Sequence, residues 1–203
     1  MSETWYEVVK PDITLTQGDL IFNCPLLAWQ GFGLKLEGEN ETEVLENATS
    51  AVSADVVVMT QACDLEHNKV ENVILCPHVS LYEHREMWES NLRTANQKPT
   101  EKAWKRHCDD IRDGFMWNLT MLNDGQIDNS SIGIRIVFFN EVHTIPRSFL
   151  ESLLGQRQSS RLRLLPPYRE HLSQAFARFF MRVGLPVPIE KNWEIEEPNQ
   201  ALS

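Results

Sequence analysis

Two short apolar runs separated by a polar segment dominate the middle of the chain. Residues 56–59 are Val-Val-Val-Met and residues 73–76 are Val-Ile-Leu-Cys, both rich in β-branched side chains. Runs of this length and composition are typical of strands that are covered on both faces. Pro77 closes the second run, and the polar residues 64–72 connect the two. The pattern therefore predicts two neighbouring buried strands joined by a turn at residues 60–64.

Further strands are expected on both sides of this pair. A Gly-Asp turn at residues 18–19 feeds an apolar stretch that continues to residue 27. Residues 115–122 predict another strand, with a turn at residues 123–125. Residues 131–139 predict a last strand, and one of its faces is expected to carry Ile132, Ile134 and Ile136.

Helical periodicity appears in two stretches. Residues 81–114 contain two helical patterns that flank a proline, and Thr100 follows that proline as the predicted N-cap of the second helix. Pro146 predicts the start of a short helix that ends at Gly155. A longer helix is expected over residues 167–183, where an apolar face includes Phe176, Phe179 and Phe180 as core side chains.

These elements indicate one α+β domain. We expect a barrel core at about residues 16–80 and 115–145, a helical insertion at residues 81–114, a C-terminal helical region at residues 146–185 and an acidic tail at residues 186–203. Residues 31–50 are polar and acidic, which predicts a long surface loop. With 203 residues and 42% hydrophobic side chains, the chain is long enough for such a core.

The N-terminus has neither a basic start nor a long apolar segment, and no apolar run approaches the roughly 18 residues of a membrane span. We therefore expect a cytoplasmic protein with no membrane contact. The four cysteines show no paired spacing, which predicts free thiols. They are Cys24, Cys63, Cys76 and Cys108.

The net charge of −10 argues against a protein that coats nucleic acid with its whole surface. Residues 146–183, however, contain seven Arg, no Lys and two acidic residues, which gives +5 and leaves −15 for the rest. Arg161, Arg163 and Arg169 surround a Pro-Pro pair ahead of the last helix, and guanidinium groups suit phosphate or carboxylate. We predict RNA or an acidic protein partner at these three residues; the alternative is a solvated basic helix face.

Gln61, Cys63 and Asp64 lie where the first buried strand is expected to end. A thiol beside a carboxylate is a candidate catalytic nucleophile, with His67 as its nearest base. A catalytic thiol needs a lowered pKa, below its usual value of about 8.5, whereas an adjacent Asp raises it. Two alternatives stay open: Asp64 caps a turn while Cys63 packs, or these residues form a pocket for a small ligand.

A zinc site would have to combine Cys63 and His67 with Cys76 and His78. If Cys76 lies opposite Val58, it is five residues, or roughly 16 Å, from Cys63. Zinc ligands each lie about 2.0–2.3 Å from one ion, and no Cys-x-x-Cys spacing is present. We therefore predict no metal site and no cofactor.

The order of several short signals resembles the MazF/PemK family, the endoribonuclease toxins of toxin–antitoxin pairs, which share a small barrel with CcdB. Residues 18–21, Gly-Asp-Leu-Ile, are similar to the start of that family's first strand. Residues 56–61 and 71–80, which end in Pro-His-Val-Ser, look like its central pair of strands. Residues 139–150 resemble the late strand that leads into a helix. The resemblance covers the segments 16–27, 53–80 and 132–185.

The resemblance implies an SH3-like (PemK/MazF-type) β-barrel with a helical insertion and a C-terminal helix, and it implies a homodimer. The family's ribonucleases carry an Arg-Pro just before the central strand, and that Arg stabilises the phosphate with help from a Thr or Ser that Ser80 matches. This chain has Ser53-Ala54-Asp55 at that place. A carboxylate there would repel the phosphate, so intact ribonuclease activity is not expected.

Three functional hypotheses follow. The first is a MazF/PemK-like component of a toxin–antitoxin or phage-defence type of system that binds nucleic acid or is regulated by a protein partner, either an antitoxin or a larger subunit. The second is a protein that binds or modifies a small molecule at Cys63 and Asp64. The third is a non-catalytic interaction subunit that docks on a larger protein.

Overall fold

The computed structural model describes residues 4–29, 48–127 and 130–181. These residues form helices and an antiparallel sheet, which confirms the predicted α+β class. The strands are β1 (Tyr6–Val9), β2 (Asp19–Trp29), β3 (Thr49–Val58), β4 (Asn72–Ser80), β5 (Leu119–Leu122), β6 (Gly125–Ile127), β7 (Ser130–Ile132), β8 (Arg135–Phe138), β9 (His143–Pro146) and β10 (Arg161–Leu164). The helices are α2 (Ala62–Glu66), α3 (Leu81–Thr94), α4 (Glu101–Arg112), α5 (Arg147–Arg157) and α6 (Tyr168–Phe180). Within these ranges no helix combines the length and the apolar character that a membrane crossing requires.

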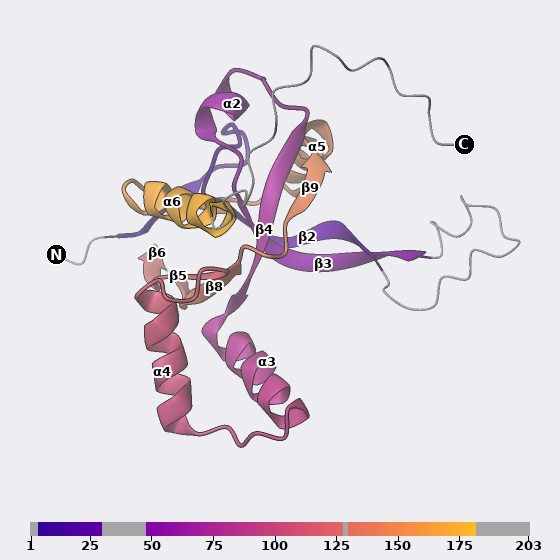
Figure 1. Cartoon of the computed structure of the whole chain (residues 1–203). Helices are drawn as coiled ribbons and strands as arrows, with labels where there is room; N and C mark the ends of the chain where they lie inside the picture. The colour runs from indigo at the N-terminus through magenta and orange to yellow at the C-terminus, as the bar shows by residue number, and fades with distance from the viewer. Residues whose placement is uncertain (1–3, 30–47, 128–129, 182–203) are drawn as a thin grey trace, which may run out of the picture.

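The main sheet has the strand order β1-β10-β2-β3-β4-β8-β5, and β9 pairs with β4 beside β8 (Figure 1). No pairing among the described strands joins the two ends of this order, so these strands do not close into a barrel. Of the predicted fold, the α+β class is therefore confirmed, and the SH3-like barrel is not confirmed by the described strands.

The central strand pair is present as predicted. β3 and β4 are antiparallel neighbours in which Val57 lies opposite Cys76 and Val58 opposite Leu75. The zinc-site estimate placed Cys76 opposite Val58, so the observed register differs from it by one residue. Val56 and Val58 pack into one hydrophobic cluster and Val57 into another, so β3 is covered on both faces because successive side chains point to opposite sides of the sheet.

The two clusters define the layers around the sheet. One cluster joins β2, β3, β4 and β9 to helices α2 and α5 through Leu65, Leu150 and Leu154. The other packs beneath α6, where Phe176 and Phe179 contact the core as predicted. Phe180, which we placed in the same apolar face, is instead 58% exposed.

The two helices predicted within residues 81–114 are present as α3 and α4, which extend together away from the sheet (Figure 1). Ser80 caps α3 through a capping box with Glu83. Thr100 caps α4 by accepting a hydrogen bond from the Ala103 N–H, as its position after a proline predicted. Ring contacts among Trp88, Trp104 and His107 join the two helices.

Three predicted boundaries are wrong. The strand expected at residues 115–122 is only β5, and the strand expected at residues 131–139 is split into β7 and β8. Because of that break, Ile132 and Ile136 pack into different clusters and not on one face. Helix α5 continues past Gly155 and ends at Arg157, and the following residue Gln158 caps it in the left-handed conformation. The predicted residues 31–47 of the loop, residue 183 of the last helix and the acidic tail lie outside the described residues.

Strand β10 was not predicted, and it determines where the C-terminal arginines lie. Residues 161–164 are Arg-Leu-Arg-Leu, and they pair with β1 on one side and with the start of β2 on the other. Gly18 at that start has a φ of +82°, and a Cβ there would meet the side chains of Leu164 and Arg169. A glycine at this turn therefore lets β10 and α6 pack closely.

Candidate functional site

The corner after β3 brings the predicted catalytic residues together on α2. Leu65 is fully buried in the core and anchors this short helix to the sheet. Cys63 is exposed, and its sulfur lies 3.8 Å from Oε1 of Gln61 and 3.7 Å from Oδ1 of Asp64. Asp64 in turn lies 3.9 Å from the ammonium nitrogen of Lys69. The thiol therefore contacts two acceptor oxygens.

Among the described residues, no imidazole is hydrogen-bonded to the Cys63 sulfur. His67 follows α2, and its backbone N–H donates to the Cys63 carbonyl at 3.1 Å. A nucleophilic thiol needs a base or a positive neighbour, and an amide oxygen with a carboxylate supplies neither. The geometry therefore adds no support to a catalytic role for Gln61, Cys63 and Asp64, which stays a prediction.

Asp55, at the position that the resemblance aligns with the arginine of MazF/PemK ribonucleases, takes part in an internal ion pair. Oδ2 of Asp55 on β3 lies 2.5 Å from Nη2 of Arg135 on β8, and Oδ1 accepts from the Asn23 N–H at 2.9 Å. Asn23 sits at an irregularity in β2 with a φ of 52°, so Asp55 secures that bulge. The Arg135 guanidinium also lies 5.5 Å from the centre of the Phe22 ring.

Arg135 further fixes the protonation state of a buried histidine. Its Nε donates to Nδ1 of His78 at 3.0 Å, and the His78 side chain is 2% exposed. Burial and, to a smaller extent, the Arg135 charge lower the pKa of His78 to about 3, against an opposing effect of the Val56 backbone. His78 is therefore a neutral acceptor at neutral pH, and this cluster holds β3, β4 and β8 together.

Ser80, which the resemblance matched to a catalytic Thr or Ser, is engaged at a helix end. Its hydroxyl oxygen accepts from the Glu83 N–H at 3.1 Å and lies 2.6 Å from the Glu83 carboxylate. The Glu83 carboxylate also accepts from the Ser80 N–H at 2.7 Å. Hydrogen bonds from Ser80 hold the pKa of Glu83 below its usual range.

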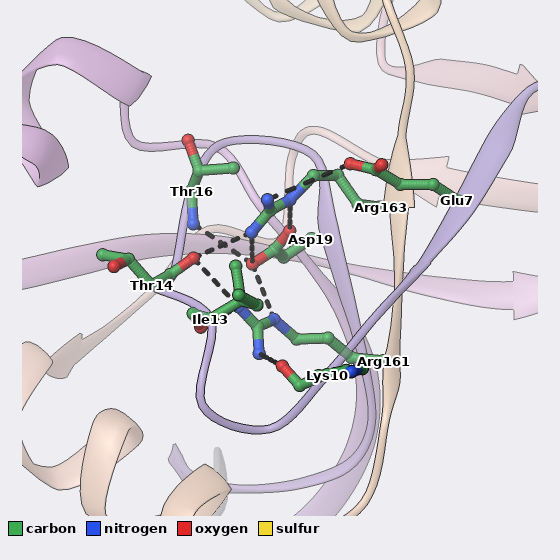
Figure 2. Close-up of polar contacts among 8 residues, drawn as sticks. All are labelled: Glu7, Lys10, Ile13, Thr14, Thr16, Asp19, Arg161 and Arg163. Atoms are coloured by element: carbon green, nitrogen blue, oxygen red, sulfur yellow. Dashed lines mark hydrogen bonds and ion pairs between the residues drawn. The ribbon is translucent and has the colours of Figure 1, made fainter.

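Arg161 and Arg163 converge on one buried carboxylate (Figure 2). Asp19 is fully buried, and its oxygens accept from Nε of Arg161 at 2.7 Å and from Nε of Arg163 at 2.5 Å. Nη2 of Arg161 donates to the backbone carbonyls of Ile13 and Thr14 at 2.7 and 3.0 Å, and Nη1 donates to that of Lys10 at 3.4 Å. Because Arg161 is only 5% exposed, its guanidinium holds this loop against β10 and is not presented to solvent.

Arg169 is not part of that network. It lies on α6 and donates to Oε1 of Glu170 from both Nε and Nη2, at 3.1 and 2.7 Å. The structure therefore brings Arg161 and Arg163 together around Asp19 and leaves Arg169 in a separate ion pair. The three residues do not form one exposed basic patch.

Two histidines in the helical insertion also meet. Nε2 of His84 lies 2.8 Å from Nε2 of His107, beside the rings of Trp88 and Trp104. Burial and, to a smaller extent, the neighbouring His107 lower the pKa of His84 to about 4. No cluster of three or more His, Cys, Asp or Glu side chains suited to a metal ion occurs among the described residues.

An apolar cleft, which the sequence did not indicate, lies between β2, β3, β9 and α5. Its volume is about 390 Å³. Leu27 is 71% exposed and Phe149 is 48% exposed beside it. None of the residues that line the cleft is Asp, Glu, Lys or Arg; they are Pro25, Leu26, Leu27, Ala51, His143, Thr144, Ile145, Pro146 and Phe149. A charge-free surface with exposed large side chains suits contact with an apolar ligand.

Sequence signals for these sites differ in strength. Arg135 was overlooked, although a charged residue between Ile134 and Ile136 in an apolar strand indicates an internal partner. The cleft had no comparable signal, because its two walls are about 120 residues apart in the chain. No protein-family model matches the chain, and no curated protein matches it significantly.

Proposed function

We propose that this protein is a MazF/PemK-like component of a toxin–antitoxin or phage-defence type of system that acts by binding a protein partner, without ribonuclease activity. The apolar cleft between β2, β3, β9 and α5 is the observation that carries the proposal. Under this proposal, the strands from β2 to β9 are the part of the chain that resembles an SH3-like barrel. The cleft lies where these strands do not pair with each other.

Exposed apolar side chains around the cleft support partner binding. Leu27 and Trp29 on β2 are each 71% exposed, and Phe149 on α5 is 48% exposed. Soluble proteins rarely leave several large apolar side chains in one region unless the region binds something. Burying about 100 Å² of such surface yields about 2.5 kcal/mol, so a few of these side chains supply useful affinity.

The polar residues argue against ribonuclease chemistry. The place of the family's arginine is taken by Asp55, whose carboxylate is bound to Arg135. Ser80 is engaged by Glu83 at the start of α3. Arg161, the residue expected to contact RNA, is 5% exposed and bound to Asp19. No free guanidinium from these residues is available for a phosphate.

Co-expression tests the proposal. The tagged full chain is produced together with the product of each gene that adjoins its own, and complexes are purified in high salt. We expect one product to co-purify in a fixed ratio and to be lost with the double variant Leu27→Lys/Phe149→Lys. The control Tyr82→Lys replaces a 70% exposed aromatic residue on α3 and should retain the partner.

Two results would contradict the proposal. One is co-purification that the double variant leaves unchanged, which would move the partner to another surface. The other is cleavage of RNA by the purified wild-type chain that is lost in Cys63→Ala or Ser80→Ala, which would restore an enzymatic function.

A further inference from the structure

We propose that the cleft accepts one short extended segment of the partner protein as an added β-strand between the open edges of β2 and β9. This inference rests on the proposed function and specifies its binding mode. The segment is apolar and uncharged over the residues that enter the cleft, and it carries an acidic residue at the end nearest Arg157.

Two of the strands that line the cleft, β2 and β9, have an unpaired edge among the described residues. β2 pairs with β10 only at Asp19 and Leu20, so beyond Leu20 it has β3 as its single partner among the described strands. β9 pairs with β4 along its whole length, and the described residues include no strand on its other side. Unpaired edges present backbone N–H and C=O groups that an extended segment can bind.

The lining combines runs of neighbouring strand residues with Ala51 of β3, which is paired with Leu27. Neighbouring residues in a strand point to opposite faces, so a cleft on one face is lined by alternate residues. Here the lining includes the consecutive residues 25–27 of β2 and 143–146 of β9. The cleft therefore reaches the backbone of both strands as well as the face of the sheet that carries Ala51.

The usable length of the edges is short. Pro25 and Pro146 lack an N–H and stand at opposite ends of the two lining stretches. At β2, Arg157 donates to the carbonyls of Phe22 and Asn23 at 2.7 and 2.5 Å, which covers the edge before Pro25. About four residues of a partner, or about 13 Å, therefore fit, and long sheet-to-sheet pairing is blocked.

The charges of the residues in and beside the cleft determine which segments it can bind. The lining contains no Asp, Glu, Lys or Arg, so a charged residue inserted there would be buried without a counter-charge. Arg157 borders the β2 edge and makes no ion pair with a carboxylate among the described residues. An acidic residue just outside the inserted stretch would meet this guanidinium.

Selection from a display library of random linear heptapeptides tests the inference on the full chain. We expect enriched peptides with apolar residues at alternate positions and an acidic residue at one end. Their affinity should fall at least tenfold with Ala51→Arg, which fills the cleft. Val52→Arg adds the same charge to the neighbouring, non-lining residue and should change the affinity less than twofold.

Peptide chemistry separates strand addition from side-chain docking. Methylation of alternate backbone nitrogens should weaken binding at least tenfold in either phase of the alternation, because one half of the N–H groups faces β2 and the other half faces β9. Tolerance of both phases would overturn strand addition. The inference would also be overturned if an Arg157→Gln variant still preferred peptides with an acidic residue at one end.

Other outcomes are also decisive. If no peptide survives counter-selection against Ala51→Arg, the cleft is not a peptide site. If sedimentation shows a dimer of the full chain that Ala51→Arg dissociates, a second copy is the occupant and the inference is wrong. The proposed function is tested separately, by co-purification. If a partner co-purifies through Leu27 and Phe149 while the selected peptides bind equally well with either set of nitrogens methylated, the proposed function holds and strand addition is wrong.

Discussion

The two ends of β2 show opposite ways of using a sheet edge. At its start, β10 covers the edge and Arg161 and Arg163 surround the buried Asp19. At residues 25–27 the same edge is uncovered and borders a cleft without charged residues. Arg161 and Arg163, although prominent in the sequence, therefore stabilise the fold. The apolar stretch at residues 25–27 is the proposed binding surface.

The largest expected effect concerns the covered end. Asp19→Ala should destabilise the protein by about 3–5 kcal/mol, because two guanidinium groups would stay buried without their carboxylate. Urea unfolding followed by circular dichroism measures the change. Asp64→Ala is the matched control, since its 3.9 Å pair with Lys69 is solvent-exposed and should contribute less than about 1 kcal/mol. Equal effects of the two variants would contradict a structural role for the arginines.

Stability should also depend on pH through buried imidazoles. The pKa values of His78 and His84 are lowered to about 3 and about 4, so the unfolded chain binds protons first as pH falls. Stability is therefore complete above the unfolded pKa of about 6.5 and decreases below it, by up to about 1.4 kcal/mol per pH unit for each histidine.

Urea titrations between pH 7 and pH 5 measure this slope. His84→Gln should reduce the slope, and the matched variant His67→Gln, at an exposed position, should leave it unchanged. A slope that does not respond to His84→Gln would show that the histidine pair does not remain neutral in the folded protein.

Whether a feature of this fold could be predicted from the sequence depends on how far apart in the chain its interacting residues are. The β3–β4 pair, both helices of the insertion and the Thr100 cap were predictable because their signals are local: apolar runs, a proline and a capping residue. β10 was missed because Arg at two of four positions hides a strand unless its partner Asp19 is known. That partner is more than 140 residues away.

The site was predicted less well than the fold, for the same reason. Cys63 and Asp64 are adjacent in sequence and do lie together, but adjacency does not supply the distant base that catalysis needs. The cleft depends on how β2 and β9 curve toward each other, and hydrophobic patterning carries no information on that curvature.

At the open end, changes should affect binding much more than stability. Leu27→Lys replaces a 71% exposed side chain and should alter the unfolding free energy by about 0.5 kcal/mol or less. The same variant should weaken a selected peptide at least tenfold. Ile145→Lys gives the contrast, since this lining residue is 7% exposed and its replacement should destabilise the fold strongly.

The smallest effect is expected at the corner. Cys63→Ser should leave stability within about 0.5 kcal/mol, because the side chain is exposed and its sulfur makes only long contacts. Peptide affinity and partner co-purification should be unchanged. A loss of either function in this variant, with unchanged unfolding, would return attention to the small-molecule hypothesis.

Amide hydrogen exchange with and without a selected peptide tests the central claim most directly, since it requires no substitution. We expect the peptide to slow exchange at residues 26–27 and 143–145 and to leave residues 161–163 unchanged. Slower exchange confined to residues 161–163 and α6 would contradict the account, because the arginine-containing end of the sheet would then be the binding surface.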